Sequence, residues 1–178
     1  MKNAGGFTLV EVMIALALMF ILFGVALPAV SGGLEAARST EARSNLLMSL
    51  TVASNKAALT GTRAVLCPSP NGNSCVDTAD WSQGWIVFLD NDGDRETDSG
   101  EAIVQQTKAL PGKVRLRSSI GRTRIVFQGN GGNAGSNVTF TICDGRGVSK
   151  ARALILNNQG RLREADATAA EIADTCVH

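Results

Sequence analysis

The chain contains 178 residues, of which 17 are Lys or Arg and 16 are Asp or Glu, so its formal net charge is only +1. Its single histidine is the terminal His178, which leaves no Ser/His/Asp or Cys/His set for nucleophilic catalysis. The four cysteines include no Cys-x-x-Cys pair of the kind that indicates a metal site. We therefore expect a protein that is not an enzyme and that holds no metal and no cofactor.

The first thirty residues combine a short leader with an apolar segment. The leader, residues 1–6, carries one lysine and ends at Gly6. Residues 7–30 contain a single charge, Glu11, and as a helix they would extend about 36 Å, enough to span a bilayer. In an ordinary secretory signal the apolar stretch precedes the cleavage site, whereas here it follows the Gly6 boundary. An ionisable group in such a segment costs roughly 2.5–3.5 kcal/mol to insert, so we expect Glu11 to have a partner.

The string Gly6-Phe7-Thr8-Leu9-Val10-Glu11 closely resembles the type III signal of type IV pilins and of type II secretion pseudopilins. The resemblance implies that a prepilin peptidase cuts between Gly6 and Phe7 and methylates the new amino group. It also implies that Glu11 neutralises the N-terminal amine of a neighbouring subunit when the helices leave the lipid and form a filament. The alternative is a single-pass anchor in which Glu11 reaches the headgroups.

Residues 31–60 are predicted to continue the helix as an amphipathic segment. Pro28 and the triplet Ser31-Gly32-Gly33 predict an interruption or a kink between the two parts. Thr60-Gly61-Thr62 predicts the end of the helix near Leu59. Apolar residues recur at helical spacing, so one face can pack on a domain: Leu46, Leu50, Ala53 and Ala57.

Residues 61–178 predict a β-rich globular domain, because short apolar runs alternate with Gly, Asn, Asp and Pro. The predicted strands are 63–66, 85–89, 102–106, 114–118, 124–128, 138–143 and 153–156, with a final short strand that includes 161–163. Residues 128–137, rich in Gly and Asn, predict an exposed mobile loop. The expected fold is therefore α+β and pilin-like. A long N-terminal helix, transmembrane in its first half, packs on a largely antiparallel sheet.

The four cysteines would lie outside the cytoplasm in this topology, where disulfides persist. Cys67 and Cys75 bracket a turn-rich segment, so a local bridge is the simplest pairing. That pairing leaves Cys143 with Cys176, which would tie the C-terminal tail to a strand. Three connectivities are possible in principle.

The segment that begins Trp81-Ser82-Gln83-Gly84-Trp85 resembles the W-x-x-G-W-x-x-F-x-D-x-x-x-D signature of the GspH/FimT group of minor pilins and pseudopilins. We expect both tryptophans in the core rather than on a ligand platform. The carboxylates that follow take positions 1, 3, 5, 9 and 12 of an EF-hand-like loop: Asp90, Asp92, Asp94, Asp98 and Glu101. Arg95 stands at position 6, where such a loop requires Gly, and strands flank the segment. A solvated hairpin tip is therefore favoured, and calcium binding stays an open alternative.

Charge is strongly segregated along the chain. Residues 76–101 hold eight acids and one base, residues 103–163 hold eleven bases and one acid, and residues 164–178 hold four acids and no Lys or Arg. Such asymmetry favours a polyanionic partner.

The segment Gly160-Arg161-Leu162-Arg163 resembles the Gly-Arg-x-Arg motif by which FimT-type minor pilins of naturally transformable bacteria bind DNA. On a strand Arg161 and Arg163 would project together while Leu162 faces the core, and two guanidinium groups can engage phosphates. We expect neighbouring basic strands to assist, through Arg115, Arg117, Arg122, Arg124 and Lys113, with Lys108, Arg146, Lys150 and Arg152 extending the patch. The alternative is a strand edge whose positive charges prevent pairing with another edge.

The sequence thus predicts a minor type IV pilin that binds double-stranded DNA without sequence preference, for uptake in natural transformation. The expected partners are DNA, other major and minor pilins, the prepilin peptidase and, before assembly, the inner membrane. The globular domain would be periplasmic and later reach the pilus surface. Two alternatives lack DNA binding: a minor pilin that primes or caps pilus assembly, and a GspH-like pseudopilin of a type II secretion system.

Overall fold

The computed structural model describes residues 6, 8–133, 135 and 137–176. Its elements are α1 (Leu9–Thr60), β1 (Arg63–Pro68), β2 (Gly84–Asp90), β3 (Ile103–Lys108), β4 (Arg115–Ser118), β5 (Ile125–Phe127), β6 (Val138–Cys143), a 3-10 turn (Val148–Lys150), β7 (Arg152–Leu156), β8 (Leu162–Asp166) and α2 (Ala169–Cys176). The chain divides into two compact units, residues 1–34 and 35–178. A long N-terminal helix followed by antiparallel sheets confirms the predicted fold class.

Helix α1 is continuous from Leu9 to Thr60, so the prediction that Pro28 interrupts it is wrong. Proline removes one backbone hydrogen-bond donor from a helix, and each glycine lowers helix stability by roughly 1 kcal/mol relative to alanine. The turns on either side can still form their own i→i−4 hydrogen bonds, so the helix continues. The part of α1 in residues 9–34 contains an apolar window with a mean hydropathy of 2.7 and no buried residue. By length and composition α1 can therefore cross a membrane.

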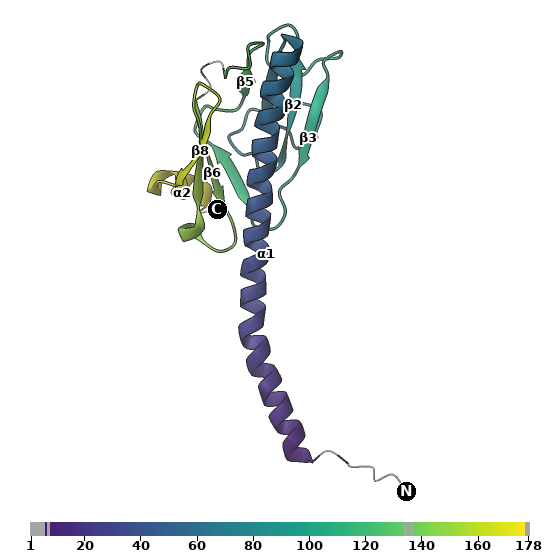
Figure 1. The fold of residues 1–178 in the computed structure, drawn as a ribbon, viewed down its shortest axis with the longest axis vertical. Helices are drawn as coiled ribbons and strands as arrows, with labels where there is room; N and C mark the ends of the chain where they lie inside the picture. The colour runs from purple at the N-terminus through teal and green to yellow at the C-terminus, as the bar shows by residue number, and fades with distance from the viewer. Residues whose placement is uncertain (1–5, 7, 134, 136, 177–178) are drawn as a thin grey trace. The chain divides into compact units, whose positions relative to one another are not determined.

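Two antiparallel four-stranded sheets replace the single sheet that the sequence suggests. Their strand orders are β3-β2-β1-β5 and β4-β6-β7-β8. After β3 the chain enters the second sheet with β4 and returns to the first with β5, which pairs with β1, before β6–β8 complete the second. Figure 1 shows the C-terminal part of α1 running beside these strands. In the unit 35–178, one face of each sheet and α1 enclose a common core.

Both tryptophans are fully buried in that core, as predicted. The Trp85 indole N–H donates a hydrogen bond to the Ser49 hydroxyl of α1 at 3.0 Å. Trp81 packs edge-on against Phe140 of the second sheet, with ring centroids 5.2 Å apart. The α1 positions predicted to face the domain are buried with them: Leu46, Leu50, Ala53 and Ala57. Every member of this core lies between Ala42 and Leu156, so residues 35–178 contain a complete core of their own.

Helix α2 was not predicted, although the sequence contains its start signal. The Thr168 hydroxyl accepts a hydrogen bond from the Glu171 amide at 3.4 Å, and the Glu171 carboxylate accepts one from the Thr168 amide at 2.7 Å. This reciprocal pair is a capping box, which Thr-x-x-Glu indicates. Helix α2 lies against β4 and β6, and Cys143–Cys176 joins it to β6. Figure 1 shows α2 near the label of β6. The other disulfide is Cys67–Cys75, so both pairings agree with the prediction.

Candidate nucleic-acid interface

The Gly-Arg-x-Arg segment forms the tip and the outgoing strand of the β7–β8 hairpin. The Asn157 carbonyl accepts a hydrogen bond from Gly160, and the Asn157 side chain accepts from the Arg161 amide at 2.9 Å. Gly160 has φ of +76°, a conformation that costs other residues strain. The turn therefore fixes where Arg161 leaves the loop, and β8 begins at Leu162. Leu162 packs against the core while Arg161 and Arg163 are exposed, the alternation expected of a strand.

The hairpin separates positive from negative charge by strand alternation. Glu164 lies on the α1 side, where it accepts a hydrogen bond from Arg43 of α1 at 2.5 Å. Asp166 forms an ion pair with Arg152 at 3.3 Å. Arg161 and Arg163 form no ion pair with any residue that the structure describes. The acids of β8 therefore pair with Arg43 and Arg152 on one face, whereas Arg161 and Arg163 project from the other face without an ion pair among the described residues.

The basic strand β4, which was expected to assist, is not adjacent to β8, because β4 and β8 are opposite edges of the second sheet. Arg115 and Arg117 of β4 share the outer face with Arg163 by register, but β6 and β7 lie between them. Three strand spacings separate the edges by about 14 Å. Helix α2 lies against β4 and β6, and its Asp174 forms an ion pair with Arg117 at 3.2 Å. Asp174 is a residue that the sequence analysis missed.

Arg124 is also engaged elsewhere. Its guanidinium binds the carboxylates of Asp77 and Glu96 and donates to the Arg95 carbonyl at 2.9 Å, and its side chain is only 13% exposed. Hydrogen bonding to Arg124 lowers the pKa of Asp77 below its ordinary value. Arg124 therefore holds the loop before β3 against the chain before β5. In contrast, Arg122 is exposed and has no ion pair within the described part of the chain.

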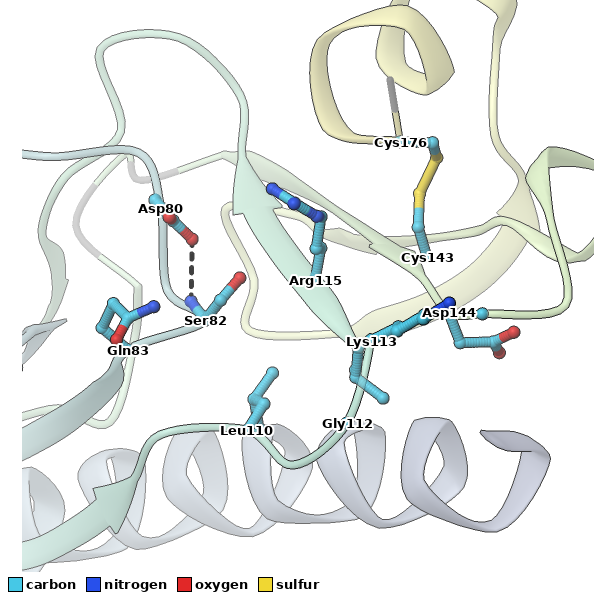
Figure 2. A pocket seen from close by; sticks show the side chains of 12 residues that line it. Asp80, Ser82, Gln83, Leu110, Gly112, Lys113, Arg115, Cys143, Asp144 and Cys176 are labelled. Carbon is cyan, nitrogen blue, oxygen red and sulfur yellow. Dashed lines mark hydrogen bonds between the residues drawn. A yellow bond between two sulfur atoms is a disulfide. The ribbon is translucent and has the colours of Figure 1, made fainter. Parts of the chain in front are cut away.

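Lys113 and Arg115 line a groove of about 560 Å³ rather than an open basic surface (Figure 2). The walls also include Asp80, Asp144 and the Cys143–Cys176 disulfide. Two carboxylates thus share the groove with two cations. We therefore do not extend the interface into it.

Asp144 and Arg146, at the end of β6, form a tightly bonded pair. The Asp144 side chain is 1% exposed and accepts from the Arg146 guanidinium at 2.7 and 2.9 Å. Burial works against ionisation of Asp144, yet the side-chain and backbone hydrogen bonds of Arg146 hold its pKa below the ordinary value. Arg146 accordingly serves this pair and is not free to extend a basic patch.

The N-terminal signal residues lie in the other unit. Gly6 is exposed, Phe7 lies outside the described residues, and Glu11 is exposed in the first turn of α1. The Glu11 amide donates to the Thr8 hydroxyl at 3.3 Å, so Thr8 acts as a helix N-cap. This contact uses the backbone of Glu11 only, so its carboxylate stays available for the predicted pairing with an amine.

Comparisons with known proteins show the family and the fold of the chain. Residues 42–160 match the family of the type II transport protein GspH, and residues 1–27 match the prokaryotic N-terminal methylation motif. No match is found among curated proteins.

Solved structures show a similar fold. Two crystal structures of the type IV minor pilin FimU of Pseudomonas aeruginosa, each 16% identical, give TM-scores of 0.56 and 0.53. The alignments cover 78% and 73% of this chain and 92% and 91% of FimU. The minor pseudopilin EpsH of the Vibrio cholerae type 2 secretion system is 12% identical, with a TM-score of 0.50 over 72% of this chain and 97% of EpsH. At these identities the likeness shows the fold alone.

Pilins and pseudopilins are structural proteins rather than enzymes, and they act with other pilins and, through the methylation motif, with the prepilin peptidase. An apolar N-terminal helix with this motif is consistent with anchoring in a membrane before assembly into a pilus. The GspH match covers well over half of the sequence. The chain therefore belongs to the GspH family and is a type IV minor pilin of the GspH/FimT kind.

Proposed function

We propose that this minor pilin binds double-stranded DNA through the β7–β8 hairpin and thereby captures extracellular DNA for natural transformation. The observation that carries the proposal is the pair Arg161 and Arg163. Both side chains are exposed and neither forms an ion pair among the described residues, although two acids follow directly in the same strand.

The geometry of the hairpin suits a polyanion better than a single acidic side chain. The two arginines stand about 6.6 Å apart along the chain, at roughly 3.3 Å per residue. Their planar guanidinium groups each offer several donors that match phosphate oxygens. The tyrosine count is zero, and Phe127 and Phe140 are buried, so stacking on bases has no support. Binding should therefore be independent of DNA sequence, because phosphates carry no base information.

The test is DNA binding by residues 35–178, with and without the double change Arg161→Gln and Arg163→Gln. Fluorescence anisotropy with a labelled duplex is measured over a series of salt concentrations. If each arginine neutralises one phosphate, the slope of log K against log salt should become shallower by about 1.8, at about 0.9 per contact. The thermal midpoint should change little, because surface substitutions usually alter stability by less than about 0.5 kcal/mol.

The matched control is Lys108→Gln with Lys150→Gln, which removes the same charge from exposed positions of the predicted wider patch that lie outside the β7–β8 hairpin. This control should retain most of the affinity for DNA, and its salt slope should be steeper than that of the arginine variant. Equal losses in both double variants would mean that affinity follows net charge rather than the hairpin. Unchanged binding in the arginine variant would reject the proposal and favour the alternative role, in which this face contacts other pilins during priming of a pilus or pseudopilus.

We further propose the processing and location that such a role requires. The peptidase would cut between Gly6 and Phe7 and methylate the new N-terminus, and Glu11 would pair with that amine in the filament. Residues 35–178 would lie on the periplasmic side of the inner membrane and then at the pilus surface, where the hairpin can meet DNA. Support comes from the methylation motif over residues 1–27.

A further inference from the structure

We propose that the β2–β3 connection binds one calcium ion through Asp90, Asp92 and Asp94. These three carboxylates each offer an oxygen, and the three oxygens lie within 4.8 Å of one another. Calcium binds oxygen ligands at 2.3–2.6 Å, so two ligands of one ion can be up to about 5 Å apart. A single ion can therefore reach all three side chains.

The buried carboxylate of Asp90 is the independent observation that calls for a cation. Asp90 ends β2 and is 2% exposed. One carboxylate oxygen accepts a hydrogen bond from the Gly93 amide at 2.6 Å, but the other, Oδ2, is buried and has no hydrogen-bond partner in the described structure. A buried carboxylate oxygen without a partner is unfavourable, and two further carboxylates nearby add repulsion. A divalent cation would remove both costs.

Hydrogen bonds to Glu101 hold together the two ends of the β2–β3 loop, which carries the carboxylate cluster. The Glu101 carboxylate accepts hydrogen bonds from the amides of Asn91 at 2.7 Å and Asp98 at 3.3 Å, which holds the two ends of the loop to each other. Arg95 was the sequence argument against calcium, because position 6 of such a loop requires glycine. Arg95 nevertheless adopts φ of +69°, so the arginine makes the turn that glycine makes elsewhere.

Three cations adjoin the cluster and should limit its affinity. Arg63 faces Asp90 in the β1–β2 register and donates to the Gly93 carbonyl at 3.3 Å. Arg95 is exposed, and Arg124 is bound to Asp77 and Glu96. With three protein carboxylates and water completing the shell, we expect a dissociation constant of about 10⁻⁴–10⁻³ M, the range of extracellular calcium modules.

The experiment measures the thermal midpoint of the full-length chain in detergent micelles by tryptophan fluorescence, which reports the core through Trp81 and Trp85. After treatment with a chelator, the protein is compared without divalent cation, with 10 mM CaCl₂ and with 10 mM MgCl₂, at constant ionic strength. Calcium should raise the midpoint by at least about 3 °C. Magnesium should do much less, because it requires a tighter octahedral shell.

Asp92→Asn should abolish the calcium shift, and without calcium it should leave the midpoint equal to or above that of the wild type, because one repulsive carboxylate is gone. The matched control is Asp98→Asn, an exposed acid of the same loop outside the cluster, which should retain the shift. The proposal is overturned if calcium gives no shift, if magnesium gives an equal one, or if both variants reduce it equally. The last two results would indicate screening of loop charge rather than a site.

Discussion

The hydrogen bond between Trp85 and Ser49 should be a major link between α1 and the sheets, and Ser49→Ala tests it. Ser49 is fully buried; its hydroxyl accepts from the indole N–H at 3.0 Å and donates to the Asn45 carbonyl at 2.8 Å. Alanine would leave the indole N–H buried without a partner. An unsatisfied buried donor costs about 1–3 kcal/mol, and the better helix propensity of alanine recovers up to about 0.7 kcal/mol.

The expected net loss is about 1–2 kcal/mol of unfolding free energy. For a unit of this size that loss lowers the thermal midpoint by roughly 2–8 °C. The assay is thermal unfolding of residues 35–178 followed by far-ultraviolet circular dichroism. Thr51→Ala is the matched control, because among the described residues this exposed hydroxyl bonds only the Leu47 carbonyl of its own helix. It should change stability by less than about 0.5 kcal/mol.

A double-mutant cycle with Trp85→Phe isolates the bond itself. Phenylalanine has no N–H that requires a partner, so Ser49→Ala should lower the free energy of unfolding much less in the Trp85→Phe background. The coupling energy between the two positions should be about 1–2 kcal/mol. If Ser49→Ala costs the same with either aromatic residue, the indole bond is not the cause and the reasoning fails.

Three further predictions concern the signal, the hairpin and the buried acid. A bulky residue in place of Gly6 should leave the leader uncleaved, which intact-mass analysis would detect. The Glu11→Ala variant should insert into the membrane but be depleted from sheared filaments. Recovery of this variant in filaments at the wild-type level would contradict the amine pairing. Gly160→Ala meets no atom within 4 Å of the added Cβ, so its cost should come from the positive φ alone, about 1 kcal/mol, together with weaker DNA binding measured by anisotropy. The lowered pKa of Asp144 means that its ionised form stabilises the fold at neutral pH, and this stabilisation is lost as the pH falls through the folded pKa. In the Arg146→Gln variant, the free energy of unfolding should therefore decrease less than in the wild type when the pH falls below about 4. An acid-unfolding profile equal to that of the wild type would argue against the pair.

The sequence by itself determined the features that depend on local pattern. The long helix and most strands follow from hydropathy, period and turn residues within a few positions of each other. The burial of both tryptophans was also expected from their apolar rings. The turn-rich spacing of Cys67 and Cys75 favoured one of three possible cysteine connectivities, and the structure has that one. Helix α2 could have been found from Thr168 and Glu171, whose spacing indicates a capping box.

The tertiary structure alone decided which basic residues are free to meet a partner. Arg117 and Asp174 are 57 positions apart, and Arg124 and Asp77 are 47 apart, so no local pattern reveals that these charges neutralise each other. The strand order of the second sheet placed β4 and β8 at opposite edges, so Arg161 and Arg163 are not adjacent to Arg115 and Arg117. The burial of Asp90 beside two other carboxylates is likewise a product of packing. Charge along a chain is fixed by composition, but its availability depends on contacts between residues that only the fold brings together.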